Sequence, residues 1–424
     1  MTDYLSQDPN VGINVSHLYI ALLLFADDMV LFSENRFNLQ VGLNKLHEYC
    51  NKWGLLVNVD KTKCLVFKKG GKKSILDKWH YNNQEIETVT TFKYLGFVFS
   101  STGTFSKGID NTILSGQRAF YNLSSNLENF DSMFVNTQLS LFNSLVSPVL
   151  SYACEIWGFA EAKKIETLHL RFLKKILRVR KTTPSCIVYK ECNVYPLFLT
   201  RIFRVISFWL KIIKLEEHEP AKILYEASIL INDNIDVENK PLSWALHVRK
   251  ILYNNGFGYI WENQYAGIND SFFSLFKNRL IDSFWQNNNS EIDSLSKNRL
   301  YRHLSTENVT YLYDMQNDFI RTSLTKLRLG SHILMVERGR WSKIVYEKRK
   351  CILCDDIEDE YHFVAICIKY HDLRVKYLPK SLYIKPSMQK FLNILNSKDT
   401  KALKKLGLFL HFAFKKYTTE EILA

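Results

Sequence analysis

Apolar and polar residues in the first sixty positions follow the period of strands and then that of a helix. Apolar residues fill positions 18–25 and 29–32, on either side of Asp27 and Asp28. This pattern predicts a strand, a tight turn and a second strand, and the first strand is expected to be buried. Apolar positions then recur every three or four residues, at Leu39, Leu43, Leu46, Cys50 and Trp53. They predict a helix that packs on a sheet and stops at Gly54.

Residues 55–100 are expected to add strands. Leu55, Val57 and Val59 alternate with polar residues as in a strand, and the apolar run 92–99 predicts another strand. The first hundred residues are therefore expected to mix helix and sheet.

Beyond residue 106 the helical period takes over. It extends over residues 109–127, 135–157 and 165–180, and Pro148 predicts a kink or break in the second of these segments. The Asn- and Ser-rich segment 287–290 is expected to be an exposed connection. The fold class is therefore α+β, with a mixed N-terminal part and a mostly helical remainder.

Length and charge set limits on function. A chain of 424 residues with 46% hydrophobic residues is expected to form two to four lobes. Its net charge of +13 attracts polyanions such as nucleic acid or an acidic membrane surface, although a basic surface also serves solubility alone.

The sequence shows no secretion signal and no transmembrane segment. Its most apolar run, residues 18–26, is far shorter than the roughly 20 residues that cross a bilayer, and its eight cysteines form no disulfide framework. We therefore expect no membrane partner and an intracellular location, nuclear or cytoplasmic.

The aspartate pair carries a chemical hypothesis. Adjacent carboxylates raise one another's pKa unless a cation neutralises them, so Asp27 and Asp28 are candidate ligands of a divalent metal ion. An ordinary exposed turn remains the alternative.

A second candidate metal site lies near the C-terminus. Cys351, Cys354, His362 and Cys367 follow the spacing C-x2-C-x7-H-x4-C and offer three thiolates and one imidazole to a tetrahedral Zn²⁺. Buried cysteines beside a surface histidine are the alternative.

A third candidate site is the helix predicted over residues 165–180. Arg171, Lys174, Lys175 and Arg178 are spaced by three and four positions, which favours one cationic face that contacts phosphates. A merely solvated face is the alternative. Trp157, Trp209 and Trp341 lie near cations and could stack on bases, although most tryptophans belong to cores.

These motifs, in this order, resemble reverse transcriptases of non-LTR (LINE-type) retrotransposons. The resemblance rests on Phe25-Ala26-Asp27-Asp28, Val57-Asn58, Lys61-Thr62-Lys63, Tyr94-Leu95-Gly96, Ser147-Pro148, Glu155-Ile156-Trp157-Gly158, Lys181-Thr182, Tyr195-Pro196-Leu197, Glu337-Arg338-Gly339-Arg340-Trp341 and the Cys/His motif.

The resemblance implies roles for single residues. Asp27 and Asp28 would hold Mg²⁺ on a palm hairpin, and Lys61 would flank the incoming nucleotide. Tyr94 and Gly96 would lie in the hairpin that holds the primer end. The implied partners are an RNA template and a DNA primer or target.

The resemblance also implies a domain order. We expect a partial palm in residues 1–104, a helical thumb in 105–215, a helical connection in 216–345, a CCHC zinc-knuckle-like motif in 346–380 and C-terminal helices in 381–424. Only 24 residues precede Phe25. The chain is therefore expected to be a C-terminal fragment that lacks the fingers and another palm aspartate and does not polymerise alone. A non-enzymatic RNA- or DNA-binding protein derived from such an element is the alternative.

The Cys/His segment departs from the short retroviral knuckle. It contains Asp355, Asp356, Glu358, Asp359 and Glu360, which disfavour contact with phosphate. We expect Zn²⁺ to order this tail and to present basic neighbours to RNA or DNA, namely Arg349, Lys350, Lys369 and Arg374.

Overall fold

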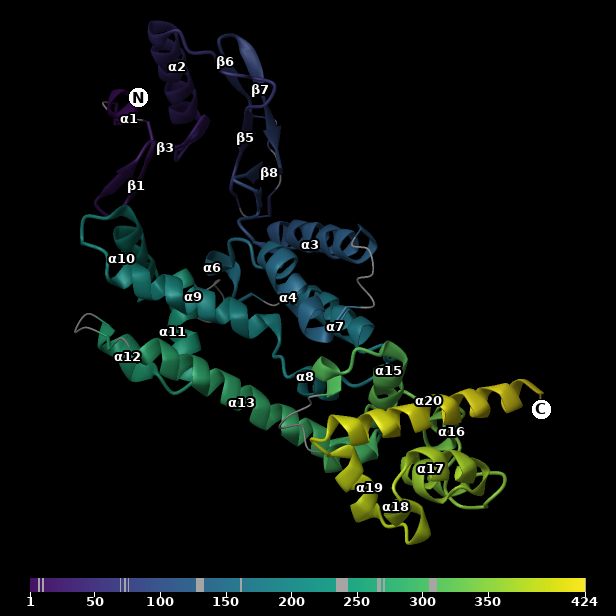
Figure 1. Ribbon diagram of the computed structural model, residues 1–424. Helices are drawn as coiled ribbons and strands as arrows, with labels where there is room; N and C mark the ends of the chain where they lie inside the picture. Colours follow the sequence, from purple (N-terminus) through teal and green to yellow (C-terminus); the bar gives the residue numbers. More distant parts are fainter. Residues whose placement is uncertain are drawn as a thin grey trace. The chain divides into compact units, whose positions relative to one another are not determined.

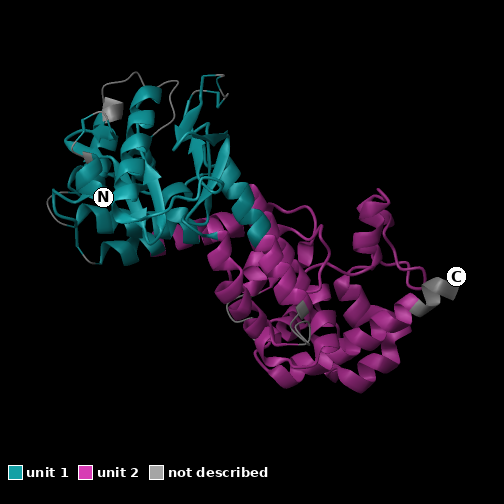
Figure 2. Ribbon diagram, turned by 90° about the horizontal axis from the view of Figure 1, so that it is seen from above, with its two compact units in different colours: residues 1–115, 151–161, 200–277 teal, residues 116–150, 162–199, 278–424 magenta. Residues whose placement is uncertain are grey.

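The computed structural model describes residues 1–424 except 7, 10, 69, 72, 73, 75, 127–132, 161, 234–242, 265–267, 270, 305–310 and 424. The chain divides into two compact units, shown in teal and magenta in Figure 2. Unit 1 comprises residues 1–115, 151–161 and 200–277, and unit 2 comprises 116–150, 162–199 and 278–424. Neither unit is one continuous stretch of chain.

All described strands lie in unit 1. They are β1 (Ile13–Val15), β2 (Leu18–Ile20), β3 (Leu22–Phe25), β4 (Asp28–Leu31), β5 (Lys63–Leu65), β6 (Trp79–Tyr81), β7 (Gln84–Val89), β8 (Thr91–Tyr94) and β9 (Phe97–Ser100). The pairs β1–β2, β3–β4 and β8–β9 are antiparallel, while β5, β7 and β6 form a three-stranded sheet in that order.

The helices follow in chain order, and α3, α9 and α13 contribute residues to both units. They are α1 (Thr2–Ser6), α2 (Arg36–Trp53), α3 (Ser106–Asn126), α4 (Val135–Leu145), α5 (Ser147–Leu150), α6 (Cys154–Trp157), α7 (Lys163–Ile176), α8 (Ser185–Cys192), α9 (Leu197–Ile213), α10 (Pro220–Asp233), α11 (Trp244–Asn254), α12 (Gly258–Glu262), α13 (Phe272–Ser294), α14 (Tyr311–Asp314), α15 (Asp318–Arg328), α16 (Met335–Trp341), α17 (His371–Tyr377), α18 (Lys380–Ile384), α19 (Met388–Leu395) and α20 (Thr400–Leu423). The short turns η4 (Arg299–His303), η5 (Tyr346–Lys348), η6 (His362–Ile366) and η7 (Ile368–Tyr370) complete the set.

Helix α2 packs on the three-stranded sheet of unit 1, as the sequence predicted (Figure 1). Its apolar face is buried with residues of the sheet, namely Leu43, Leu46, Cys50, Cys64, Trp79, Tyr81 and Ile86. The side chain of Asn35 caps its first turn, and Gly54 ends it in a left-handed conformation at φ 64°.

The strand predictions for residues 55–100 need correction. Residues 55–59 form no strand, and Val57 and Val59 instead pack as partly buried side chains against the α2 core. The apolar run 92–99 is a hairpin of two strands, because Leu95 and Gly96 both have positive φ and reverse the chain.

The predicted helices form at the expected positions, but their lengths differ from the prediction. The predicted helix 135–157 is three short helices, with a break at Val146 just before Ser147-Pro148. The predicted exposed connection 287–290 lies inside α13, where the amide of Asn288 is buried and donates to the carbonyl oxygen of Cys186 at 3.1 Å. That bond satisfies a polar side chain within a helical core.

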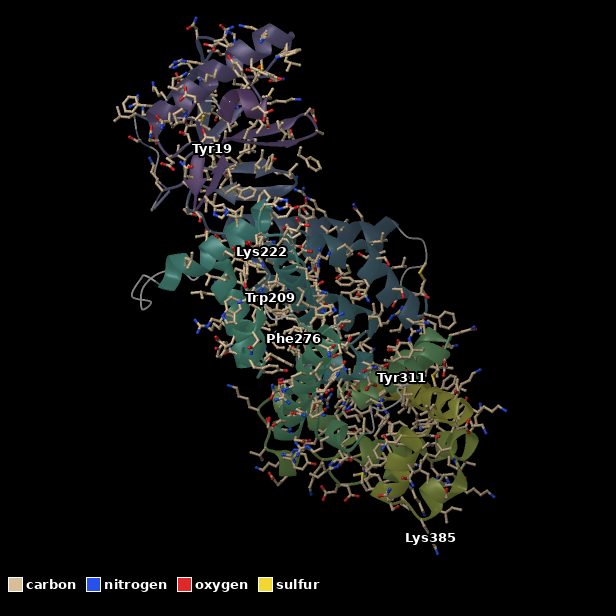
Figure 3. All side chains as sticks on the ribbon, turned by 90° about the vertical axis from the view of Figure 1, so that its left-hand side faces the viewer. Tyr19, Trp209, Lys222, Phe276, Tyr311 and Lys385 are labelled. Atoms are coloured by element: carbon tan, nitrogen blue, oxygen red, sulfur yellow. The ribbon has the colours of Figure 1, made fainter. Side chains whose placement is uncertain are left out.

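Unit 2 contains a buried ionic network around Glu191 of α8. Its carboxylate accepts from Arg328 Nε at 2.7 Å and from the hydroxyls of Tyr301 and Tyr311, the latter labelled in Figure 3. Arg328 also donates to the carbonyl oxygen of Leu395 at 2.9 Å. Burial alone would lower the pKa of Arg328, but the carboxylate beside it raises that pKa above its ordinary value.

The α+β fold class is confirmed as a mixed, mostly helical architecture. The five consecutive domain ranges stay predictions, since each compact unit draws on separate stretches of the chain. Among the described helices, none has the length and the apolar run that a bilayer crossing needs.

Candidate nucleic-acid and metal sites

The aspartate pair lies at the tip of the β3–β4 hairpin. Phe25 pairs with Asp28 across the turn, and Ala26 has a φ of 54°. Asp27 and Asp28 are both exposed, and the described residues offer neither carboxylate a hydrogen bond or an ion pair. The strand–turn–strand prediction is confirmed, and the two carboxylates are free to take a cation.

The strand that leads into this turn differs from the sequence prediction. Leu22 is buried, but the next three side chains, Leu23, Leu24 and Phe25, are 47%, 53% and 61% exposed. The predicted buried strand is therefore wrong beyond Leu22. The hairpin rests on unit 1 by its base and leaves its tip open.

Lys61 lies in a turn after α2. The side chain of Asn58 accepts from the Lys61 backbone N–H at 3.0 Å, and the Thr62 hydroxyl donates to the Asn58 carbonyl oxygen at 2.8 Å. This fixes the backbone of Lys61 while its side chain stays exposed. Among the described residues, no hydrogen bond or ion pair joins Lys61 to Asp27 or Asp28.

Tyr152 contacts the turn of the hairpin that contains Tyr94 and Gly96. The Tyr152 hydroxyl donates to the Leu95 carbonyl oxygen, and Trp157 Nε1 donates to the Tyr152 carbonyl oxygen at 3.0 Å. Gly96 has a φ of 85°, and a Cβ there would lie 3.2 Å from the Tyr152 ring. Tyr152 lies between two motifs that carry the resemblance, Ser147-Pro148 and Glu155-Ile156-Trp157-Gly158, but no role was predicted for it.

The cationic helix prediction needs correction. Helix α7 ends at Ile176, and Arg178 lies beyond it in a left-handed conformation with a φ of 53°. Arg178 pairs with Asp318 at 2.5 Å, and Lys174 Nζ donates to the Lys181 carbonyl oxygen at 2.8 Å. The predicted row of four is therefore split, because two of its members are bound within the fold.

Arg171 and Lys175 remain on α7, where Arg171 is exposed and Lys175 is half-buried. The opposite face is buried as predicted, including Phe172, Leu173 and Ile176.

The four residues of the Cys/His motif converge in unit 2. The ligand atoms of Cys351, Cys354, His362 and Cys367 all lie within 4.8 Å of one another. Two sulfur–sulfur distances, from Cys367 to Cys351 and to Cys354, are 3.9 Å. Tetrahedral Zn–S bonds of about 2.3 Å place sulfurs roughly 3.8 Å apart, so the spacing suits zinc.

Burial makes this cluster ready for a cation. Both ring nitrogens of His362 are buried and have no hydrogen-bond partner among the described residues. Burial also lowers the pKa of His362 and raises the pKa of Cys367 to about 12. A neutral imidazole and a thiol that ionises only beside a positive charge both fit a zinc ligand set.

The acidic residues within the motif hold the fold together. Glu358 accepts from the Met335 backbone N–H at 2.8 Å and from the Tyr417 hydroxyl at 2.9 Å, while Glu360 lies 2.9 Å from His332. The Glu358 carboxylate thus links the motif to α16 and α20.

The basic neighbours of the motif are less available than predicted. Arg374 is buried and donates to the backbone carbonyl oxygens of Val364, Ile366 and Cys367. Arg349 donates to the carbonyl oxygens of Ile344 and Val336 at 2.9 Å.

Lys350 and Lys369 are also engaged. Lys350 pairs with Asp355 at 3.0 Å, and Lys369 lies over the rings of Tyr370 and Tyr417. The prediction that Arg374 faces nucleic acid is therefore wrong, because Arg374 is buried against the backbone of its own segment. For Arg349, which is half-buried, it stays a prediction.

Two of the three tryptophans proposed for base stacking are unavailable. Trp157 and Trp209 are fully buried, and only Trp341 is exposed, by 44% of its surface.

The comparisons with known proteins support the resemblance to reverse transcriptases. Residues 3–99 match the family model for reverse transcriptase (RNA-dependent DNA polymerase). The match contains the aspartate hairpin, α2 and the Tyr94–Gly96 turn.

Two relatives carry the same indication. A putative uncharacterized transposon-derived protein of Caenorhabditis elegans is 23% identical over 162 residues, which cover 38% of this chain and 57% of that protein. The retrovirus-related Pol polyprotein from a type-2 retrotransposable element of Drosophila melanogaster is 33% identical over 100 residues, 22% of this chain and 10% of the polyprotein. The match spans just over half of the first relative and a tenth of the second. Residues 3–99 of this chain are therefore similar to the reverse transcriptases of non-LTR retrotransposons.

Proposed function

We propose that this chain serves RNA-directed DNA synthesis by binding Mg²⁺ at Asp27 and Asp28 and by holding an RNA template and a DNA primer. The observation that carries the proposal is the hairpin turn within the family match, where two adjacent exposed carboxylates have no neutralising partner among the described residues. Two adjacent exposed carboxylates offer several oxygen ligands to a cation.

The carboxylates of Asp27 and Asp28 would supply oxygen ligands, which Mg²⁺ prefers. When bound, the metal supplies activation of the primer 3′-hydroxyl and stabilisation of the leaving pyrophosphate. Asp27 stands in the turn between Ala26 and the first residue of β4, so it is the main ligand in this proposal, with Asp28 second.

Lys61 and the β8–β9 turn would position the substrates. Lys61 has a fixed backbone and a free, exposed side chain, which suits a cation that neutralises phosphate charge. Tyr94 ends β8, and Gly96 lies in the turn that Tyr152 holds in place; a fixed turn suits a support for the primer end.

Helix α7 would contribute phosphate contacts through Arg171 and Lys175, which lie on the helix together with Lys174, whose Nζ already donates to the Lys181 carbonyl oxygen. The Cys/His cluster would bind Zn²⁺ and order the segment that α16, α17 and α20 surround. In this proposal its role is structural, because the basic residues next to it already bind within the fold.

The 424-residue sequence is proposed not to extend a primer by itself. Two-metal catalysis needs more oxygen ligands than the two carboxylates of one turn provide. The test is primer extension with Mg²⁺, an RNA template, a DNA primer and nucleotides, run beside a binding assay with the same template.

We expect binding without extension. If the chain extends a primer and Asp27→Asn abolishes that extension, the proposal that this sequence does not polymerise alone is wrong. The assignment of Asp27 as a metal ligand is then supported. Failure to bind any template at low salt would overturn the proposed role in nucleic-acid binding.

The alternative is a non-enzymatic RNA- or DNA-binding protein derived from such an element. The net charge of +13 favours it, since it supports binding whether or not the metal site is complete. Primer extension in the presence of a separately supplied palm segment would separate the two functions.

A further inference from the structure

Unit 2 contains a small recess that is lined in part by Trp341, the exposed one of the three tryptophans proposed for base stacking. Six of the residues that line it are Arg180, Thr182, Thr183, Asn298, Arg340 and Trp341. They come from the turn after α7, the residue before η4, and α16. We call it the Arg180 recess.

Arg180 is fixed in the recess but incompletely bonded. Its guanidinium lies over the Trp341 ring, with Cζ 3.8 Å from the ring centroid, and its backbone N–H donates to the Ser331 hydroxyl at 2.9 Å. Its Nη1 is buried and has no hydrogen-bond partner within the part of the chain that the structure describes. A buried charged donor without an acceptor is costly, so an acceptor from outside the fold would stabilise this atom.

The charge around the recess favours an anion as that acceptor. Glu337 also lines the recess, but its carboxylate is taken by Arg340 Nη2 at 2.7 Å and Arg340 Nε at 3.2 Å. One positive charge, that of Arg180, is therefore left over. Lys326 lies nearby, and burial together with the charges of Arg180 and Arg178 lowers its pKa.

Two hydroxyls accompany the guanidinium. Thr182 is exposed at the recess and Thr183 is buried, in a turn that the Thr183 N–H closes on the Arg180 carbonyl oxygen at 3.0 Å. A guanidinium, hydroxyls and the exposed part of an aromatic ring are groups that proteins use on phosphates and the nucleotides joined to them.

The size of the recess limits which chemical groups it can hold. Its volume of about 10 Å³ is close to the roughly 10–15 Å³ that one water-sized group occupies. It can admit one phosphate oxygen but cannot enclose a base or a whole nucleotide. The remainder of the ligand must lie outside, as it does for a phosphate within a polymer backbone.

We propose that the Arg180 recess seats one backbone phosphate of a bound nucleic-acid strand. Arg180 Nη1 donates to a phosphate oxygen, and the Thr182 hydroxyl donates to the same group at the mouth. The inference rests on the proposed nucleic-acid binding and adds a phosphate contact that is independent of α7 and of the Cys/His cluster.

The test uses fluorescently labelled single-stranded RNA and the full chain, with affinity measured by anisotropy from about 50 to 200 mM salt. Arg180→Gln should weaken binding about tenfold at low salt and reduce the slope of log affinity against log salt by about 0.7, the loss of one phosphate contact. The matched control is Lys385→Gln, which removes one charge from an exposed position of the same unit (Figure 3).

A second pair of variants keeps the test valid if Arg180→Gln unfolds the chain. Thr182→Asp places a carboxylate at the mouth of the recess and should weaken binding about tenfold, whereas Ser381→Asp, at an exposed position of α18, should not. Thermal unfolding of each variant shows whether it is folded.

The outcomes separate the two proposals. RNA binding with unchanged affinity and salt slope in both recess variants would overturn the phosphate seat and leave the proposed function intact. No RNA binding by the unmodified chain would overturn the proposed function and, with it, this inference. Equal losses in recess and control variants would also overturn the seat, because they would show a general charge effect.

Discussion

The two groups of side chains proposed to bind metal ions differ in what surrounds them. The Cys/His cluster consists of four ligands that the fold of unit 2 has already gathered, three of them buried. The aspartate pair consists of two exposed carboxylates at the tip of a hairpin whose last three strand residues are also exposed. In the proposed function, the first group stabilises the protein around a cation, and the second receives a cation together with a substrate.

This difference separates stability from activity in variants of the two sites. Ligands gathered in a core should affect folding when they are changed. Ligands on an open turn should affect function and leave folding alone.

The largest effect is expected at the Cys/His cluster. Cys351→Ser should abolish stoichiometric zinc binding and lower the free energy of unfolding of unit 2 by on the order of 5 kcal/mol, because metal-binding energy becomes folding energy. Metal analysis per chain and hydrogen exchange over residues 346–417 measure both effects. Cys186→Ser, at a buried cysteine outside the cluster, should retain zinc. Full zinc content in Cys351→Ser would show that the cluster is not a zinc site.

The next largest effect is expected at Glu191. It tests whether the stability of unit 2 depends on the Cys/His cluster alone. Glu191→Gln leaves the buried Arg328 without its counter-charge and should destabilise the protein by about 3–5 kcal/mol while zinc content is unchanged. Denaturant unfolding measures the loss, and Glu347→Gln, at an exposed position, is the control. A loss of zinc in Glu191→Gln would mean that the two buried groups are coupled.

A smaller effect is expected at the buried imidazole of His169. Burial lowers the pKa of His169 in α7 to about 4, and this side chain stacks on Phe142 outside any group of thiols. The unfolded histidine titrates near about 6.5. Its contribution to stability is therefore present above pH ~6.5 and is lost as the pH falls toward ~4, by at most about 3 kcal/mol.

His169→Phe should remove this dependence and should lose less stability than the unmodified chain between pH ~6.5 and ~4.5. Unfolding free energies across that range provide the measurement. His218→Gln, at an exposed histidine, is the control. Parallel curves for His169→Phe and the unmodified chain would show that His169 does not titrate in this way.

The smallest effect on stability is expected at the aspartate hairpin. Asp27→Asn should change the free energy of unfolding by less than about 0.5 kcal/mol, because the carboxylate is exposed. In any preparation that extends a primer, the same change should lower the rate by about a hundredfold or more. Asp3→Asn, at another exposed position of unit 1, should affect neither quantity. Marked destabilisation by Asp27→Asn would remove the contrast between the two sites.

Local signals predicted the parts of the fold that local interactions determine. The spacing of apolar residues and Gly54 gave helix α2, and the two aspartates between apolar runs gave the β3–β4 turn. The spacing of the Cys/His motif gave a cluster that the structure brings together.

The remaining features depend on partners distant in sequence. Arg178 leaves its helix toward Asp318, and Asn288 is buried because the Cys186 carbonyl oxygen accepts from it. Arg374 is buried because it bonds the backbone of the Cys/His segment. Periodicity assigns such residues to exposed surfaces, since their partners cannot be found from spacing.

The make-up of unit 1 bears on how the protein forms during translation. The β3–β4 hairpin carries the aspartates, and the β8–β9 hairpin follows it along the chain. Tyr152, which holds the β8–β9 hairpin, comes about sixty residues after that hairpin. Unit 1 is complete only with residue 277. At the roughly 5–20 residues per second of protein synthesis, the hairpins wait many seconds for these later segments. An N-terminal piece that stops at residue 104 would lack Tyr152, so it would be a poor substitute for the unit in any experiment on the aspartates.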